Sequence, residues 1–327
     1  LKSDSEILSK GNSKLSGGDG KWDLLGYGLD ATGDMLDLAS VSDAPIIDVE
    51  KFDNDYHTRI DLNGTIEGTF GLYVGYSALD YLNDVSNTKS FDGKGDVKIA
   101  GTEKGKEKNF SASLKTSSSN QTTNTYSSKY SYATYEAYQR VKRIRFTGDA
   151  DMQLLMQYLT PEFINNIATK NADDLVKRYG THVMLDISIG GCLRFNYRGV
   201  VSASSSTQEK KTKVSVGLGV SVLGIGVNLS PDKSKEEITK ITSETSDKEY
   251  TGKYYGGTNS GQSISIDKDG RTTENINFSS WQQSVNDKNA ALIDVGRAVF
   301  LYDFIADPVK KALVKAAVEK HIKDSQP

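Results

Sequence analysis

The sequence predicts an α+β domain, because strand-like and helical segments occupy separate stretches of the chain. Short apolar runs divided by Gly and Asp fill residues 24–76, and two long strand-like runs follow at residues 132–146 and 182–200. Apolar residues at helical spacing are concentrated in residues 150–179 and 307–323. No Pro-rich or Gly/Ser-rich linker divides the 327 residues into two balanced halves, so one large domain is expected.

The N-terminal part of the chain is predicted to change from a flexible segment to short strands. Residues 1–20 are rich in Ser, Gly, Asp and Lys and read as a flexible lead-in to a domain at residues 21–327. Order is expected to begin near Trp22. Short strands are predicted at Leu24–Gly28, Ile46–Val49 and Ile60–Leu62, and a longer one at Gly68–Tyr76.

Three helices are predicted between residues 150 and 179. Apolar residues at helical spacing mark the first, namely Met152, Leu155, Met156 and Leu159. Thr160 and Pro161 supply a cap and a first-turn proline for the second helix, and Asn171 starts the third. Gly180 ends the third helix, because glycine readily adopts the left-handed backbone found there. A final helix at residues 307–323 follows Asp307–Pro308.

Two segments, residues 101–131 and 201–247, are too polar to build a core of their own. The first is a tract of Ser, Thr, Asn and Gln with a short alternating apolar run, Phe110, Ala112 and Leu114. The second begins and ends in Ser, Thr, Lys and Glu, but apolar residues alternate in its middle. These two segments therefore need an explanation other than the core of a globular domain.

The alternation in the second segment predicts an amphipathic β-hairpin. Apolar residues fall on even positions up to residue 222 and on odd positions after it: Val214, Val216, Leu218, Val220 and Val222, then Ile225, Val227 and Leu229. A two-residue turn at Leu223–Gly224 would place all of them on one face. Each arm then approaches the 9 to 11 residues of a tilted membrane-spanning strand, with Lys211 and Lys213 on the polar side.

Two observations leave alternatives open for this hairpin. It could be an ordinary buried hairpin packed on its own domain. Pro231 would fall opposite Val216 and remove a hydrogen-bond donor, and the return run is sparse in apolar residues. Because Gly and β-branched residues are poor helix formers, disorder or mixed structure is expected for this segment before any conversion.

Several motifs together resemble the membrane-attack-complex/perforin (MACPF) family. Tyr179, Gly180, Thr181 and His182 resemble the family signature, and they precede a strand that reaches Gly190–Gly191. The motifs that follow in the order of the family are Gly256–Gly257, Ser280–Trp281 with Ser284, and Leu301–Ile305. The resemblance covers residues 20–323, nearly the whole chain. Because Cys192 is the one cysteine in the sequence, a disulfide framework is excluded, which points to a bacterial-type member.

The resemblance implies a MACPF/cholesterol-dependent-cytolysin-like fold, with a bent four-stranded antiparallel sheet flanked by helices and two insertion segments. Gly190, Gly191, Gly256 and Gly257 would mark the bend of that sheet. The implied function is a secreted pore-forming or membrane-attack protein that assembles into a ring or arc and converts both segments into transmembrane hairpins. A non-lytic surface adhesion or interaction module with the same fold is the alternative, and Pro231 favours it.

The remaining observations bear on chemistry, partners and location. No nucleophile motif or carboxylate pair is recognisable, His182 reads as a structural residue and Cys192 as a packed thiol, so we expect no enzyme, cofactor or metal site. A net charge of −3 argues against nucleic acid as a partner. The expected partners are a target membrane, further copies of the chain, and a surface receptor or glycan. A start at Leu1 without Met fits a secreted or lipid-anchored surface protein.

Overall fold

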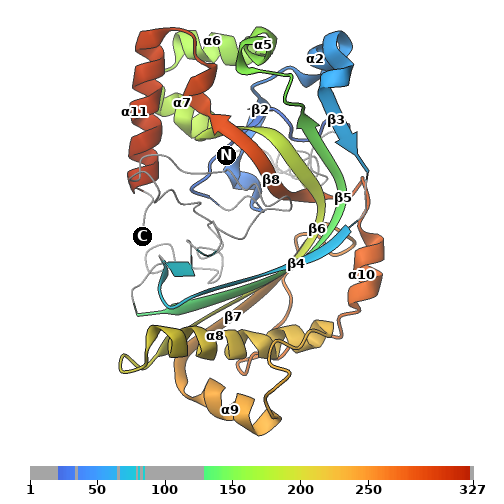
Figure 1. The fold of residues 1–327 in the computed structure, drawn as a ribbon, viewed down its shortest axis with the longest axis vertical. Helices are drawn as coiled ribbons and strands as arrows, with labels where there is room; N and C mark the ends of the chain where they lie inside the picture. The colour runs from blue at the N-terminus through green and yellow to red at the C-terminus, as the bar shows by residue number, and fades with distance from the viewer. Residues whose placement is uncertain are drawn as a thin grey trace, which may run out of the picture.

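In the computed structural model, which describes residues 21–33, 36–64, 67–78, 80–81, 84 and 129–324, a long bent sheet runs through the molecule (Figure 1). The strands are β1 (Tyr27–Leu29), β2 (Val41–Pro45), β3 (Ile60–Asn63), β4 (Glu67–Gly75), β5 (Ser131–Phe146), β6 (His182–Val201), β7 (Thr245–Tyr255) and β8 (Ala291–Phe300). The helices are α2 (Val49–Tyr56), α5 (Met152–Leu155), α6 (Pro161–Thr169), α7 (Ala172–Tyr179), α8 (Thr207–Val222), α9 (Lys235–Ser243), α10 (Phe278–Ser284) and α11 (Pro308–Asp324).

The two longest strands, β5 and β6, form the centre of the sheet and pair with each other along most of their length. Their outer neighbours change along the way. In the upper half of Figure 1, β3 pairs with β5 and β8 with β6; in the lower half, β4 pairs with β5 and β7 with β6. All these pairings are antiparallel, so each half is a four-stranded antiparallel sheet. The two small strands β1 and β2 extend the upper half beyond the end of β5.

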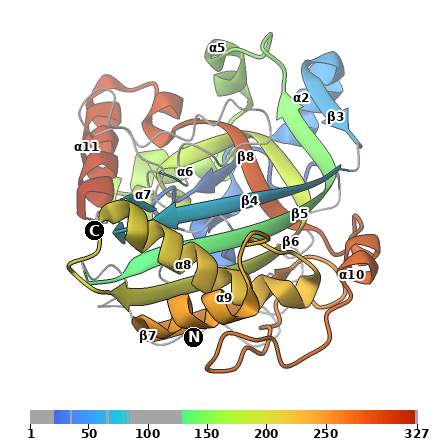
Figure 2. The ribbon, with the colours of Figure 1, turned by 60° about the horizontal axis from the view of Figure 1, so that its bottom comes forward.

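Helices cover the two halves differently. In the upper half, α6, α7 and α11 pack with the sheet into one large apolar core that includes Phe163, Leu175 and Val318. In the lower half, α8 lies across the strands, with α9 beyond it (Figure 2). A second core, called the lower core below, forms between α8 and the sheet and includes Phe195 and Tyr197. Each half of the central strands is therefore buried against its own set of helices.

Much of this architecture agrees with the expectations from sequence. The antiparallel α+β fold is confirmed, and so are the long strands β5 and β6 and the helices α5, α6 and α7. Helix α11 differs by one residue at each end from the range 307–323, and its face toward the core is Val314, Ala317, Val318 and Ile322, whereas Leu313 is exposed. The predicted lead-in, residues 1–20, lies outside the described residues.

The expectation of disorder or mixed structure in residues 201–247 is wrong. In the structure this segment holds two regular helices, α8 and α9. The predicted turn at Leu223–Gly224 is one turn of 3-10 helix that ends at Gly226, which has a left-handed φ of 82°. No hairpin is present between residues 211 and 229, so the alternative of an ordinary buried hairpin is also wrong.

Candidate functional site

The second polar segment is inserted between two paired strands. The last pair of the β6–β7 ladder joins Val201 to Thr245, and the chain between them forms α8 and α9. A segment placed in this way is the loop of an antiparallel hairpin. If its residues became extended, they could continue β6 and β7 without any change in the order of the strands.

Both helices of the segment begin at serines that cap them, a signal that sequence reasoning overlooked. The Ser206 hydroxyl accepts a hydrogen bond from the Glu209 N–H at the start of α8. At the start of α9, Ser234 and Glu237 cap each other reciprocally. A serine followed three residues later by glutamate is a known helix-start signal. It marks where both helices begin, although the alternation of Val and Gly after Ser206 favours a strand.

One face of α8 packs tightly on the sheet. Val214, Leu218 and Val222 are fully buried and contact the lower core, which includes Phe195 and Tyr197 of β6. Gly217 lies between them, and a Cβ at this position would meet the Tyr197 ring at 2.7 Å. Glycine therefore allows the helix to approach the strand closely.

The other predicted hairpin residues lie elsewhere on or beyond the helix. Val216 is buried outside the lower core, and Val220 is half-buried. Ile225, Val227 and Leu229 follow the helix and pack against the same core. In a helix, Val216 and Val220 project away from the stripe formed by Val214, Leu218 and Val222, since successive residues turn by about 100°. The structure thus divides a set of side chains that a strand would place on one face.

The balance of energies explains why this sequence is helical. Relative to Ala, Gly217 and Gly219 cost about 1 kcal/mol each in a helix, and each Val costs up to about 0.7 kcal/mol. Burial of Val214, Leu218 and Val222 contributes about 1.5–3 kcal/mol for each side chain. Packing on the sheet therefore outweighs poor propensity, so α8 depends on its docking for much of its stability.

Polar contacts hold α8 at both ends. The Lys213 Nζ lies 3.0 Å from a Glu244 carboxylate oxygen, and the Lys211 Nζ lies 3.8 Å from Asp80. Near the other end, the buried Ser221 hydroxyl donates to the Gly270 carbonyl at 2.8 Å. The lysine pairs are partly exposed, so each contributes at most about 1 kcal/mol. The apolar face, rather than these contacts, provides most of the attachment.

The four predicted hinge glycines meet where the neighbour of β6 changes. Gly190 pairs with Ala291 of β8, and Cys192 pairs with Tyr255 of β7. A Cβ on Gly190 would lie 2.0 Å from the Gln139 carbonyl oxygen, so only glycine fits there. Opposite, β5 carries one extra residue between Arg140 and Lys142. A bulge facing a residue without a side chain bends the sheet at this level.

Trp281 of α10 packs against three of these glycines. Its indole N–H donates to the Gly256 carbonyl at 3.2 Å, and its ring lies within 3 Å of where Cβ atoms on Gly191 and Gly257 would be. Gly256 and Gly257 have φ values of 74° and 77°, a region that favours glycine. The motif containing Trp281 therefore fills the bend, a role that the sequence did not predict.

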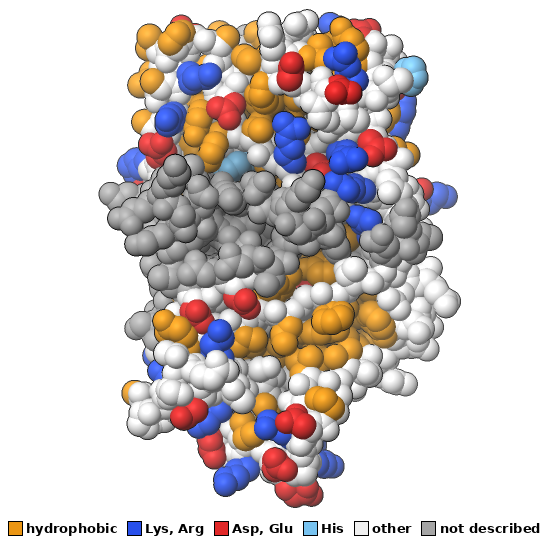
Figure 3. Space-filling model, in the orientation of Figure 1, with side chains coloured by type: hydrophobic (Ala, Val, Ile, Leu, Met, Phe, Trp, Pro, Cys, Tyr) orange, Lys and Arg blue, Asp and Glu red, His pale blue; other side chains and the backbone are white. Residues whose placement is uncertain are grey.

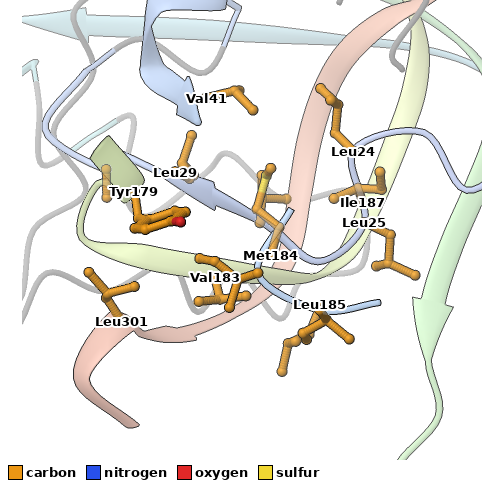
Figure 4. Packing of buried hydrophobic residues seen from close by; sticks show 14 of the residues in the cluster. Leu24, Leu25, Leu29, Val41, Tyr179, Val183, Met184, Leu185, Ile187 and Leu301 are labelled. Carbon is orange, nitrogen blue, oxygen red and sulfur yellow. The ribbon is translucent and has the colours of Figure 1, made fainter. Parts of the chain in front are cut away.

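The signature residues form a junction between α7, β1 and β6 rather than a reactive site. Tyr179 is buried beside Leu29 and Val183 (Figure 4), and its hydroxyl accepts a hydrogen bond from the Asn166 amide at 2.7 Å. Gly180, with a φ of 83°, packs directly on the Leu29 backbone. This packing lets the chain turn from helix to strand against β1.

Thr181 and His182 complete this junction. The Thr181 hydroxyl oxygen accepts a hydrogen bond from the Ala31 N–H and lies 2.7 Å from His182 Nδ1. The buried imidazole lies against the Phe300 ring, with centroids 4.5 Å apart. Both residues therefore connect the N-terminal strands to β6 and β8, which agrees with a structural role.

The first predicted insertion segment falls almost entirely outside the described residues. Of residues 101–131, the structure describes 129–131, and Phe110, Ala112 and Leu114 are not among them. Its flanking ladder is described. Strand β4 pairs with β5 from Glu67–Arg140 to Gly75–Tyr132 without any shift of register.

The described part of the chain lacks both a metal-binding cluster and a helix able to cross a membrane. It contains no cluster of His, Cys, Asp or Glu suited to hold a metal ion. Cys192 is buried, with its sulfur 3.7 Å from a Glu136 carboxylate oxygen. Among the described helices, none combines the length and apolar character needed to cross a membrane.

Comparison with known proteins identifies the family. The MAC/Perforin (MACPF) domain model matches residues 20–327, so the chain belongs to this family. The matched range contains Tyr179–His182, the four glycines at the bend, and α8. None of the curated proteins searched is similar enough to count as a match.

Two solved bacterial structures share the fold. One is a candidate cell invasion protein with a MAC/Perforin domain from Bacteroides thetaiotaomicron. It is 18% identical in sequence, with a TM-score of 0.64, and the match covers 92% of this chain and 60% of that one. GNIP1Aa from Chromobacterium piscinae is also 18% identical, with a TM-score of 0.64 over 94% of this chain and 56% of that one. This chain therefore spans less than two thirds of the length of either structure, and the likeness shows a shared fold.

Proposed function

We propose that this protein forms membrane pores by converting residues 202–244 from α8 and α9 into a hairpin that continues β6 and β7. One observation carries the proposal. Residues 214–229 have the two-residue period of an amphipathic hairpin, yet residues 214–222 belong to the helix α8, which is docked on the sheet by its buried face. Val216 and Val220 lie off the face of α8 that packs on the lower core, whereas a strand would place them on one face with Val214, Leu218 and Val222.

The dimensions of the alternating run suit a membrane. Val214–Val222 has nine residues, or roughly 30 Å along a strand at about 3.3 Å per residue. At a tilt of about 40°, this length covers roughly 23 Å, close to the apolar band of about 25 Å on transmembrane barrels. Lys213 and Ser215 would face the lumen, which avoids a cost of about 2–4 kcal/mol for a lysine facing lipid at mid-depth.

The first segment would supply a second hairpin. Continuing the register of the β4–β5 ladder from its last pair, Gly75–Tyr132, sets residue 97 opposite residue 110. These are Val97 and Phe110, so the proposed apolar residues Phe110, Ala112 and Leu114 would share a face with Val97. Four strands from each subunit would then enter the barrel.

Several subunits would be needed to close such a barrel. β4 is an outer strand of the described sheet, and its Phe70 is 75% exposed, stacked on Tyr135 with ring centroids 6.3 Å apart. Figure 3 shows hydrophobic side chains grouped on the lower half of the same face that Figure 1 presents. An outer strand with an exposed apolar side chain suits another copy of the chain. Secretion, a target membrane and a receptor or glycan complete the proposal.

A second candidate function is a non-lytic surface interaction module with this fold. It is favoured by Pro231, which would face Val216 in the converted hairpin and remove a donor from the ladder. It requires no unwinding of α8. The two functions differ in whether this helix must leave the sheet.

The decisive experiment locks α8 in place. Gly219 and Leu229 suit an engineered disulfide, because a Cβ on Gly219 would lie 3.5 Å from the Leu229 Cβ, within the range seen in disulfides. In the converted hairpin the two residues would lie on opposite faces, so the bond blocks conversion. We expect the variant with Gly219→Cys and Leu229→Cys to release less than a tenth of the dye released by wild type, with recovery after reduction.

Vesicles of phosphatidylcholine, with and without cholesterol, and of phosphatidylethanolamine with phosphatidylglycerol would serve as targets. The matched control carries Gly219→Ser and Leu229→Ser and cannot form the bond. Release by the oxidised double cysteine variant at the wild-type rate would contradict the insertion of this segment. Binding without release on every vesicle, by wild type, would favour the interaction module.

A further inference from the structure

The ladder between β6 and β7 is regular over most of its length and shifts by one residue at its end. From Cys192–Tyr255 to Arg198–Glu249, each step forward on β6 matches one step back on β7. Beyond Arg198–Glu249, the next described pairs are Val200–Ser246 and Val201–Thr245. On this stretch Gly199 alone therefore faces two residues, Asp247 and Lys248, which is a β-bulge.

The bulge is built from particular residues. Asp247 has a φ of 50°, one of two positive values among the described residues other than glycine. This left-handed region is disfavoured for most L-residues, although Asp tolerates it better than most. A Cβ on Gly199 would lie 2.4 Å from the Thr245 methyl carbon, so the bulge places buried Thr245 over a residue that must lack a side chain.

The bulge also fits the soluble arrangement of the second segment. Thr245 is the first residue of β7 and follows α9 almost directly. The Nζ of Lys248, one of the two bulged residues, donates to the carbonyl of Thr242 in the last turn of α9 at 3.2 Å. The extra residue thus lies where the chain leaves the ladder for the helices.

Counting along the two strands shows what the bulge does to a converted hairpin. If the regular pairing Arg198–Glu249 continued, each step forward on β6 would match one step back on β7. After 24 such steps, Val222 would pair with Ile225. These residues flank the two-residue turn Leu223–Gly224, and all the apolar residues then share one face. Counted instead from the bulged pair Val201–Thr245, residue 222 meets Gly224, and the apolar faces of the two arms point in opposite directions.

We infer that the bulge of Gly199, Asp247 and Lys248 is a register switch, present in the soluble state and removed when the hairpin forms. This inference rests on the proposed function and specifies how it is regulated. With the bulge, the ladder can end in α8 and α9, but it cannot continue into an amphipathic hairpin. Without it, the register of the soluble ladder continues directly into the hairpin, and Asp247 returns to an extended backbone opposite Val200.

A deletion and an insertion that compensate each other test the register. Deleting Asp247 removes the extra residue, so a converted hairpin would be one residue out of phase. Inserting one serine between Asp232 and Lys233, in the exposed turn before α9, also shifts the phase by itself. Together, the two changes restore the original pairing from residue 215 to the turn. We expect each single variant to release dye at least tenfold more slowly than wild type, and the double variant to recover to within about threefold.

The outcomes separate this inference from the function on which it rests. Release by the folded deletion variant at the wild-type rate would overturn the register switch alone. Failure of the double variant to recover, while it keeps the melting temperature of wild type, would do the same. Absence of release by wild type on every vesicle would overturn the proposed function together with this inference.

Cross-linking provides a second measurement if the deletion variant does not fold. In a Cys192→Ser background, the pair Val220→Cys and Val227→Cys should form a disulfide in membrane-inserted protein. The pair Val220→Cys and Gly226→Cys, which follows the bulged register, should not. The reverse pattern would overturn the inference.

Discussion

The two halves of β6 are covered by helices that differ in how well their own sequences favour a helix. The half from His182 to Gly190 lies against α6, α7 and α11, and polar contacts at Thr181 join it to the N-terminal strands. The half from Cys192 to Val201 is covered by α8, whose alternating apolar residues suit a strand better than a helix. The same strand therefore runs through one part in which the local sequence favours the observed helices and another in which it favours a strand.

This difference indicates where the proposed conversion would take place. In the upper half, local propensity, capping and burial all favour the observed helices, which is typical of a structure with a single stable state. In the lower half, α8 has the Ser206 cap, but its alternating apolar residues favour a strand, so tertiary packing supplies most of what favours the helix. We therefore expect mutations in the upper half to change global stability and mutations in the lower half to change the conversion of the segment.

The largest effect is expected from Phe163→Ala in the upper core. Phe163 is fully buried and packs edge-on against Tyr179, with ring centroids 5.0 Å apart. The substitution should lower the free energy of unfolding by about 3–5 kcal/mol in urea denaturation. The exposed Ile164→Ala is the control and should change it by less than about 1 kcal/mol. Equal effects would mean that this core does not define the stable half.

The next effect is expected from Leu218→Ala in α8. Removing this fully buried side chain should cost about 2–5 kcal/mol of docking free energy. The amides of α8 should then exchange with solvent faster, while those of α7 stay protected, and dye release should accelerate. Leu223→Ala is the matched control, because Leu223 is 51% exposed. Faster exchange throughout the molecule would contradict separate behaviour of the two halves.

A smaller effect is expected at the boundary between the halves. In Gly191→Ala, the new methyl group would lie 2.8 Å from the Trp281 ring and 2.7 Å from Val285. Overpacking of this kind costs about 1–3 kcal/mol. Thermal unfolding would measure the loss, and Val285→Ala in the same chain should partly relieve it. An unchanged melting temperature would show that the bend does not depend on this contact.

Two glycines of α8 should respond in opposite ways. Gly219→Ala meets no atom closer than 3.5 Å and should stabilise the docked helix by up to about 1 kcal/mol, which would slow dye release. Gly217→Ala places a methyl group against the Tyr197 ring and should loosen the helix instead. Hydrogen exchange of α8 would measure both changes. Equal responses would show that helix propensity alone controls the segment.

The smallest effect is expected from pH in the upper half. Burial by itself would raise the pKa of the Asp30 carboxyl, but hydrogen bonds with His321 and Thr32 lower it below the ordinary 3.8. A lowered carboxyl pKa contributes stability above the unfolded pKa, and this contribution is lost as pH falls through the folded value. Asp30→Asn should therefore melt below wild type at pH 6, and the difference should shrink toward pH 3. A constant difference would contradict this origin.

Sequence reasoning reached much of the fold but only part of the site. The strands β5 and β6 and the helices from residue 152 to 179 could be predicted, because their apolar spacing, caps and Gly180 all agree. The resemblance also indicated the four glycines that lie at the bend, and their role as a hinge stays a prediction. Trp281 in the bend and the bulge at Asp247 could not, since both depend on contacts between residues distant in the chain.

By itself, the sequence determined which residues alternate, which helices carry their own caps and apolar faces, and where glycines permit a bend. Only the tertiary structure decided that residues 207–222 form a helix. Their alternation favours a strand, and burial of Val214, Leu218 and Val222 on β5 and β6 overrides it. The register of β6 with β7 was likewise decided by the tertiary structure, because it depends on which residues of two strands distant in the chain pair with each other.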